Sequence, residues 1–187
     1  MPNPQITPLS FAWVKGATAL SHKRRTGKPT FYRSDFYGNA MKTFTQMAMR
    51  GPSAWSVADR ELMAAYVSKI NESPFCIHTH TATPARAYHD PDKVEAALTW
   101  LDSAPIDEPL KQTLHFVAKL IREGGVDGDD VRAVLSAGAS PEQIEDALGV
   151  CFAFNTTTRL ANAFGFELLS PEGLEAGAKD LLKRGYR

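Results

Sequence analysis

The chain has 187 residues, carries 21 basic and 21 acidic side chains for a formal net charge of zero, and is 43% hydrophobic. This composition excludes bulk disorder, and the lack of a basic excess argues against a nucleic-acid partner. Two cysteines are too few for a disulfide-stapled secreted scaffold. The start lacks the pattern of a secretory signal, and no apolar run approaches the roughly 18 residues of a membrane span. We therefore expect a cytoplasmic protein with no membrane or nucleic-acid partner.

The first part of the chain gives weaker signals than the rest. Residues 10–22 and 34–50 are predicted to be helical from their apolar spacing. Residues 22–33 between them are basic and rich in turn formers. In a chain of zero net charge, we interpret this segment as a solvated loop, or as a salt-bridged arm at a subunit contact, rather than as an anion site.

Helix-start signals recur from residue 56 onward. Each consists of a short polar residue at a predicted N-cap, and most are followed by proline at the first helical position. The N-cap residues are Ser56, Ser73, Asp90, Ser140 and Ser170. Apolar residues between these signals recur every three or four positions, and no segment shows the strict alternation of a strand. The sequence therefore predicts an all-α fold.

Candidate catalytic residues concentrate between residues 61 and 90. With Ser73 as N-cap and Pro74 as the first helical residue, Cys76 falls in the first turn of a helix. The helix dipole favours an anion there, and thiolates are stabilised at such positions. His80 follows four residues later and so lies on the same helical face. A cysteine and a histidine at this spacing have the geometry of an activated thiol nucleophile.

Glu61 belongs to the preceding predicted helix, residues 57–71. Small residues on its face let a neighbouring helix approach closely, and a short turn should pack the two helices antiparallel. The carboxylate could then reach His80 directly or through one water and orient the imidazole. Pro84 cannot donate the helical hydrogen bond to residue 80, so we expect the second helix to kink or end nearby.

Several other residues have alternative interpretations. His78 lies two residues from Cys76 and points elsewhere on a helix, which indicates a polar lining or surface position. Cys76, His78, His80 and His89 have suitable chemistry for a metal, but their spacing matches no standard zinc pattern, so we expect no metal. Cys151 falls on an apolar helical stripe and is interpreted as structural. The alternative makes it a partner thiol for Cys76.

The stretch ADRELMAAYVSKINESPFCIHTHTA resembles the signature of the AhpD-like alkylhydroperoxidases, within the carboxymuconolactone decarboxylase superfamily. That signature is a glutamate, a gap, and then Cys-x-x-Cys-x-x-x-His. Glu61, Cys76 and His80 match it, whereas Ser73 stands at the first cysteine position. The segment IEDALGVCFAFNTTTRLANAFGFEL is similar to the closing helix of the family. The resemblance covers roughly residues 40–168.

The resemblance implies an AhpD-like helical bundle that forms homo-oligomers, commonly trimers or hexamers, and needs no cofactor. It divides the chain into an N-terminal helical extension over residues 1–39, packed along a subunit interface, an AhpD-like domain over residues 40–168, and a C-terminal tail helix over residues 169–187. In the peroxidases of the family, the two cysteines form a redox pair, and the glutamate and histidine relay protons.

The departure at Ser73 leaves three hypotheses. The first is a one-cysteine thiol peroxidase in which Cys76 reduces a hydroperoxide, His80 and Glu61 relay protons, and an external thiol or Cys151 restores Cys76. The second is a cofactor-free, decarboxylase-like lyase that uses His80 and Glu61 as acid and base. The third is a non-enzymatic oligomeric or small-molecule-binding protein that keeps the scaffold.

Overall fold

The computed structural model describes residues 38–186, which form eight α-helices and a short 3-10 helix, with no strand in that range. This confirms the all-helical prediction. The elements are α2 (Asn39–Arg50), α3 (Val57–Ile70), α4 (Pro74–Tyr88), α5 (Pro91–Thr99), η2 (Leu101–Ser103), α6 (Glu108–Glu123), α7 (Gly128–Ser136), α8 (Pro141–Phe164) and α9 (Pro171–Arg184). The helix predicted over residues 10–22, the basic segment and most of the N-terminal extension lie outside the described residues.

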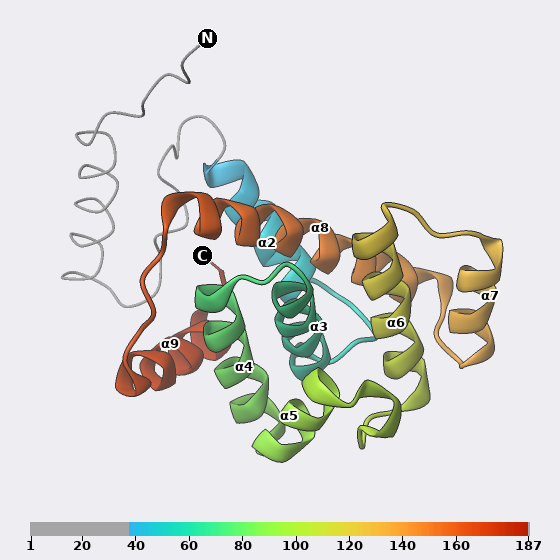
Figure 1. Cartoon of the computed structure of the whole chain (residues 1–187), viewed down its shortest axis with the longest axis horizontal. Coiled ribbons are helices and arrows are strands. Elements are labelled where there is room, and N and C mark those ends of the chain that lie inside the picture. The colour runs from blue at the N-terminus through green and yellow to red at the C-terminus, as the bar shows by residue number, and fades with distance from the viewer. Residues whose placement is uncertain (1–37, 187) are drawn as a thin grey trace, which may run out of the picture.

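Helix α3 occupies the middle of the molecule (Figure 1). It packs against α2, α4, α5, α6 and α8. Every residue from Arg60 to Ser68 is buried, so this helix has no solvent-facing side over more than two turns. A helix surrounded in this way needs no amphipathic pattern, and any charged residue on it must find partners inside the protein.

Most of the predicted helix starts are confirmed by hydrogen bonds from backbone N–H groups to the cap side chains. Ser56 and Ser140 each form a capping box, and Asp90 and Ser170 each accept one backbone hydrogen bond. At the other ends, α6 and α8 stop at Gly124 and Gly165, whose φ angles of 76° and 60° place them in the left-handed region that favours glycine. Local sequence therefore determines most of the helix boundaries.

Helix α4 differs from its prediction in two respects. Ser73 is its N-cap residue, but the serine side chain makes no capping hydrogen bond. The sequence also predicts that the helix kinks or ends near Pro84, and it does not end there but continues to Tyr88. Packing of α4 between α3 and α9 is the physical reason, because these contacts offset the hydrogen bond that proline cannot donate.

Helix α9 packs against α4 and returns the end of the described chain to the interior, beside α3 and α4 (Figure 1). An exposed ion pair between Arg86 and Glu175 joins the two helices. Tyr186, two residues after the end of α9, accordingly reaches the centre of the fold.

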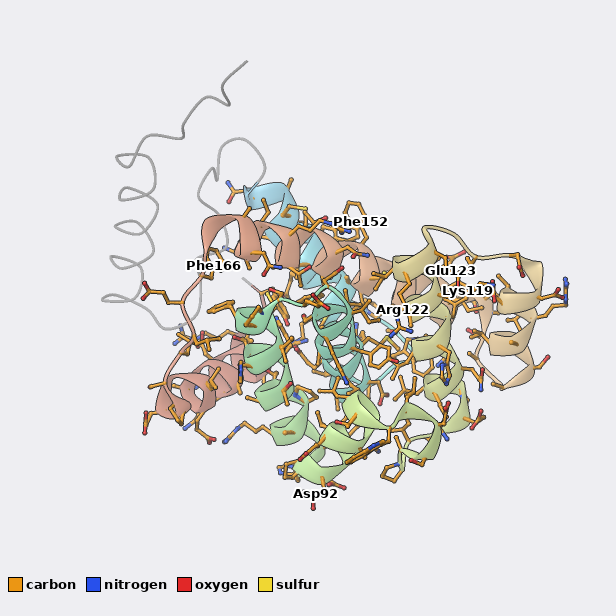
Figure 2. All side chains as sticks on the ribbon, in the orientation of Figure 1. Asp92, Lys119, Arg122, Glu123, Phe152 and Phe166 are labelled. Atoms are coloured by element: carbon orange, nitrogen blue, oxygen red, sulfur yellow. The ribbon has the colours of Figure 1, made fainter. Side chains whose placement is uncertain are left out.

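The surface of α2 and α8 carries an exposed aromatic pair. The rings of Phe44 and Phe152 meet edge to face with centroids 5.0 Å apart, and Phe152 stands out from α8 in Figure 2. Within residues 38–186, no helix combines the length and the apolar character needed to cross a membrane.

Candidate functional site

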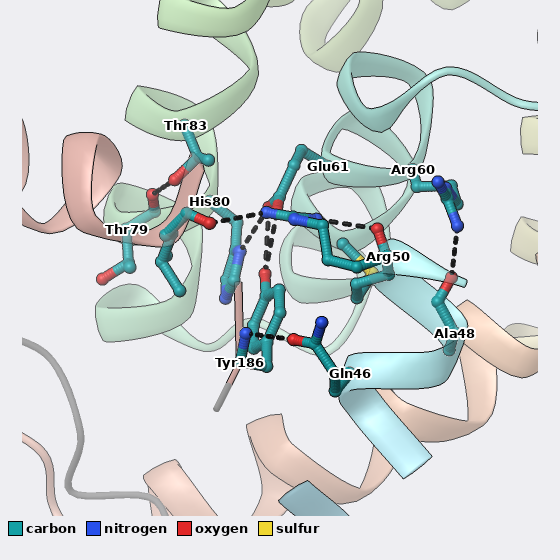
Figure 3. Close-up of polar contacts among 11 residues, drawn as sticks. Gln46, Ala48, Arg50, Arg60, Glu61, Thr79, His80, Thr83 and Tyr186 are labelled. Carbon is teal, nitrogen blue, oxygen red and sulfur yellow. Dashed lines mark hydrogen bonds and ion pairs between the residues drawn. The ribbon is translucent and has the colours of Figure 1, made fainter. Parts of the chain in front are cut away.

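Glu61 lies at the centre of the site and is completely buried. Three side chains from three parts of the chain surround its carboxylate (Figure 3). Arg50 at the end of α2 donates from Nη2 to Oε1 over 2.5 Å, and His80 of α4 places Nδ1 3.3 Å from Oε2. The hydroxyl of Tyr186 lies 3.0 Å from Oε2 and 3.1 Å from Oε1. The structure therefore brings Glu61 and His80 into direct contact, without a bridging group.

The charge of Glu61 follows from these contacts. Burial alone would raise the pKa of Glu61, but the hydrogen bond and charge of His80 and the Arg50 guanidinium outweigh it and leave the pKa lowered. An ionised carboxylate can only accept hydrogen bonds, so Nδ1 of His80 must carry the proton of their contact. In a neutral His80, Nε2 is then the free proton acceptor.

Arg50 is fixed independently of Glu61. Its guanidinium donates to the carbonyl oxygens of Met49 at 2.8 Å and Leu181 at 3.0 Å, the second of which belongs to α9. The same group lies over the ring of Tyr186, with its carbon 5.2 Å from the ring centroid. Arg50 thus connects α2, α3 and α9 around a single buried negative charge.

Two aromatic rings enclose His80. Phe154 of α8 stands edge to face with the imidazole at 4.5 Å between centroids. The ring of Tyr186 lies nearly parallel to the imidazole, at 6.3 Å and 12° between planes. The backbone N–H of Tyr186 donates to Oε1 of Gln46 over 2.7 Å, which holds the tyrosine in place. These rings limit the orientations open to His80 and separate the dyad from water.

Cys76 occupies the first turn of α4, as predicted, and is only 1% exposed. Burial raises the pKa of the Cys76 thiol, and the neighbouring Ser73 hydroxyl offsets part of that effect. The thiol is therefore protonated at rest and needs a base. Once ionised, the Cys76 thiolate would add to the effects of burial and of the Glu61 charge, which raise the pKa of Tyr186.

Ser73 is fully buried, yet its Oγ has no hydrogen-bond partner among the described residues. It lies near the Cys76 thiol without meeting the geometry of a hydrogen bond. An unpaired buried hydroxyl costs about 1–3 kcal/mol, and capping the helix would have avoided that cost. The side chain that replaces the first motif cysteine is thus adjacent to the candidate nucleophile and free to bond with it.

The remaining candidates lie away from this cluster. His78 and His89 are exposed. Cys151 is buried on α8 as a free thiol, where its Sγ accepts from Nδ2 of Asn155 at 3.3 Å. Burial raises the pKa of Cys151 to about 11, against smaller opposing effects of Asn155 and Arg159. Across residues 38–186, no group of three or more His, Cys, Asp or Glu side chains is arranged to hold a metal ion.

Sequence reasoning did not find Arg50, Phe154 or Tyr186. Arg50 is one basic residue in the last turn of a helix, and Phe154 is one member of an apolar stripe. Tyr186 follows a helix in a segment with no recognisable motif. A weak signal did exist for a cation: a glutamate on a helix face that a neighbouring helix approaches closely needs a positive partner if it is buried, although the sequence does not say which one.

Residues 37–119 match the family model of the carboxymuconolactone decarboxylase family. The matched residues make up less than half of the chain and include Glu61, Cys76 and His80, so this part of the chain resembles the carboxymuconolactone decarboxylase family. Among solved structures, it is similar to an uncharacterized peroxidase-related protein from Silicibacter sp. TM1040, with 25% identity, 91% of each chain covered and a TM-score of 0.69.

Two further solved structures share the fold of this chain. One is a peroxidase-related protein with an alkylhydroperoxidase AhpD core from Ralstonia eutropha JMP134, at 19% identity, with 95% of this chain and 94% of that chain covered and a TM-score of 0.73. The other is a protein of unknown function from Agrobacterium tumefaciens, at 19% identity, with 75% and 98% covered and a TM-score of 0.63. No curated protein matches the chain.

Proposed function

We propose that the protein is a thiol-dependent peroxidase that reduces hydroperoxides through the single cysteine Cys76. The observation that supports this function best is the buried Glu61–His80 contact, which gives α4 an oriented imidazole four residues after the thiol. The Silicibacter and Ralstonia proteins, described as peroxidase-related, favour the same chemistry.

The first half of the reaction begins with a protonated thiol, because burial disfavours the thiolate. Nε2 of His80 takes the thiol proton, and the sulfur attacks the terminal oxygen of the hydroperoxide. The O–O bond breaks, the sulfur is oxidised by two electrons to a sulfenic acid, and the leaving oxygen takes the proton from His80. Cys76–SH and ROOH thus become Cys76–SOH and ROH, while Glu61 stays ionised and stabilises the transient imidazolium.

The second half of the reaction needs an external thiol. Ser73 cannot form a disulfide with Cys76, and Cys151 is a buried free thiol whose pKa of about 11 disfavours its thiolate. A first external thiol condenses with the sulfenic acid to form a mixed disulfide and water. A second external thiol attacks that mixed disulfide, which releases Cys76–SH and a disulfide that joins the two external thiols.

Consumption of an organic hydroperoxide in the presence of excess dithiothreitol tests this function. Cys76→Ser should abolish consumption, whereas Cys151→Ser, which changes a second buried cysteine on another helix, should retain it. Full activity in Cys76→Ser would overturn the thiol mechanism. Turnover of a different substrate that survives Cys76→Ser but not His80→Gln would instead indicate acid–base chemistry of the lyase kind.

Homo-oligomerisation is proposed from the family resemblance, with a trimer or hexamer as the expected state. Light scattering coupled to size-exclusion chromatography measures it directly. A monomeric mass at micromolar concentration would contradict this proposal without affecting the thiol chemistry.

A further inference from the structure

Tyr186 makes more contacts with the candidate relay than its distant position in the chain predicts. Its hydroxyl lies 3.0 Å from Oε2 of Glu61, the same oxygen that faces Nδ1 of His80 at 3.3 Å. Its ring lies beside the imidazole and beneath the Arg50 guanidinium, and its backbone is anchored to Gln46. These contacts fix the position of the Tyr186 side chain and direct its hydroxyl to the carboxylate of Glu61, which indicates a role beyond packing in the core.

The direction of the hydrogen bond to Glu61 is determined by charge. Burial, followed by the negative charge of Glu61, holds the pKa of Tyr186 well above its ordinary value. The phenol therefore keeps its proton and donates it to the carboxylate. Because the hydroxyl has one hydrogen, it serves either Oε1 or Oε2 at any moment, and Oε2 is the oxygen it shares with His80.

We propose that Tyr186 is a positioning residue of the relay, whose hydrogen bond draws negative charge of Glu61 away from His80 and so sets the pH at which Cys76 becomes nucleophilic. This inference rests on the proposed thiol function. Tyr186 acts through Glu61 and His80, not by contact with the reacting oxygen atoms. Tyr186, beyond the end of α9, thereby becomes part of the site.

The charged and titratable groups that contact Glu61 or act on Tyr186 beside it come from α2, α4 and the segment after α9. Arg50 approaches from α2, and His80 with Cys76 from α4. Arg60, the neighbour of Glu61 on α3, directs Nη1 to the carbonyl oxygens of Ala48 and Gly51 rather than to the carboxylate. Helix α8 contributes the apolar ring of Phe154. Tyr186 is thus the neutral donor of the set.

Replacing Tyr186 by phenylalanine isolates the hydroxyl, because the ring and its contacts remain. The carboxylate then keeps its bonds to Arg50 and His80 but loses the competing donor on Oε2. A less neutralised carboxylate stabilises the protonated imidazole more strongly, which favours the ion pair of imidazolium and thiolate. The Cys76 thiolate should therefore form at lower pH in the variant.

The rate of Cys76 alkylation by iodoacetamide, measured across pH in a Cys151→Ser background, tests the inference without any peroxide. We expect Tyr186→Phe to move the midpoint of the rate profile down by about half a pH unit or more, as the loss of one hydrogen bond to a charged group predicts. Tyr66→Phe is the matched control, because Tyr66 is a buried tyrosine of α3 whose pKa is raised by burial and affected by Arg122 and Asp102 rather than by Glu61. An unchanged or raised midpoint in Tyr186→Phe would overturn the inference.

His80→Gln in the same assay distinguishes a failure of the role of Tyr186 from a failure of the proposed thiol function. If His80→Gln moves the midpoint and Tyr186→Phe does not, the relay stands and the role of Tyr186 is refuted. If His80→Gln leaves the midpoint unchanged, the imidazole does not control the thiol, and the proposed function fails together with the inference that rests on it.

Discussion

Replacing Glu61 by glutamine should destabilise the protein by about 3–5 kcal/mol, the usual cost of removing one partner from a buried ion pair. The chain offers a close comparison. Arg50–Glu61 and Arg86–Glu175 both have N···O distances of 2.5 Å, but Glu61 is fully buried and Glu175 is 71% exposed. Glu175→Gln should cost only about 0–1 kcal/mol, because exposed pairs are solvated and screened. Because the N···O distance is the same in the two ion pairs, the predicted difference in stability loss comes from burial.

Urea unfolding, followed by circular dichroism, measures both changes at pH 7. Because the folded pKa of Glu61 is lowered, its contribution is fully present above its unfolded pKa and is lost as the pH falls through the folded value. The difference between wild type and Glu61→Gln should therefore shrink in acid. If Glu61→Gln and Glu175→Gln lose equal stability, the claim that buried partners stabilise the Glu61 charge is refuted.

Three further predictions concern the thiol and its neighbours. Ser73→Cys should restore the family's cysteine pair, and intact-mass measurement after one equivalent of peroxide should show the loss of two hydrogens; a stable sulfenic acid instead would contradict the proximity of residues 73 and 76. Ser73→Ala should leave the free energy of unfolding unchanged or higher, because it removes an unpaired buried hydroxyl. The same change should raise the pH midpoint of Cys76 alkylation, because the Ser73 hydroxyl lowers the pKa of the thiol. An unchanged midpoint would show that the hydroxyl does not act on the thiol. His80→Gln should slow the reaction of Cys76 with hydroperoxide by about 10²–10⁴-fold in stopped-flow traces, the typical contribution of a general acid–base group, and an unaffected rate would exclude its role as base.

The helices and their boundaries could be read from the sequence because local chemistry determines them. Ser56, Ser140 and Ser170 cap helices as their sequence context predicts, and Gly124 and Gly165 end them. Ser73 shows the limit of such reasoning. Its position as N-cap is correct, but its side chain turns to the interior near Cys76. Tertiary packing overrides a local preference at the site itself.

The contact between Glu61 and His80 could be anticipated because the two residues lie on helices joined by a short turn. The partners that define the charge of Glu61 could not. Tyr186 is 125 positions away in the sequence, and its approach depends on how α9 packs against α4. Arg50 is only 11 positions away, yet its direction depends on how α2 crosses α3. Spacing along one helix carries no information about either arrangement.

Trapping of oxidised Cys76 tests the central claim most directly. The protein is treated with one equivalent of an organic hydroperoxide in the presence of dimedone, and the modified peptides are identified by mass spectrometry. The account predicts a dimedone adduct on Cys76, none on Cys151, and a strongly reduced adduct in His80→Gln. A Cys76 that stays unmodified while the folded protein is exposed to excess hydroperoxide would contradict it.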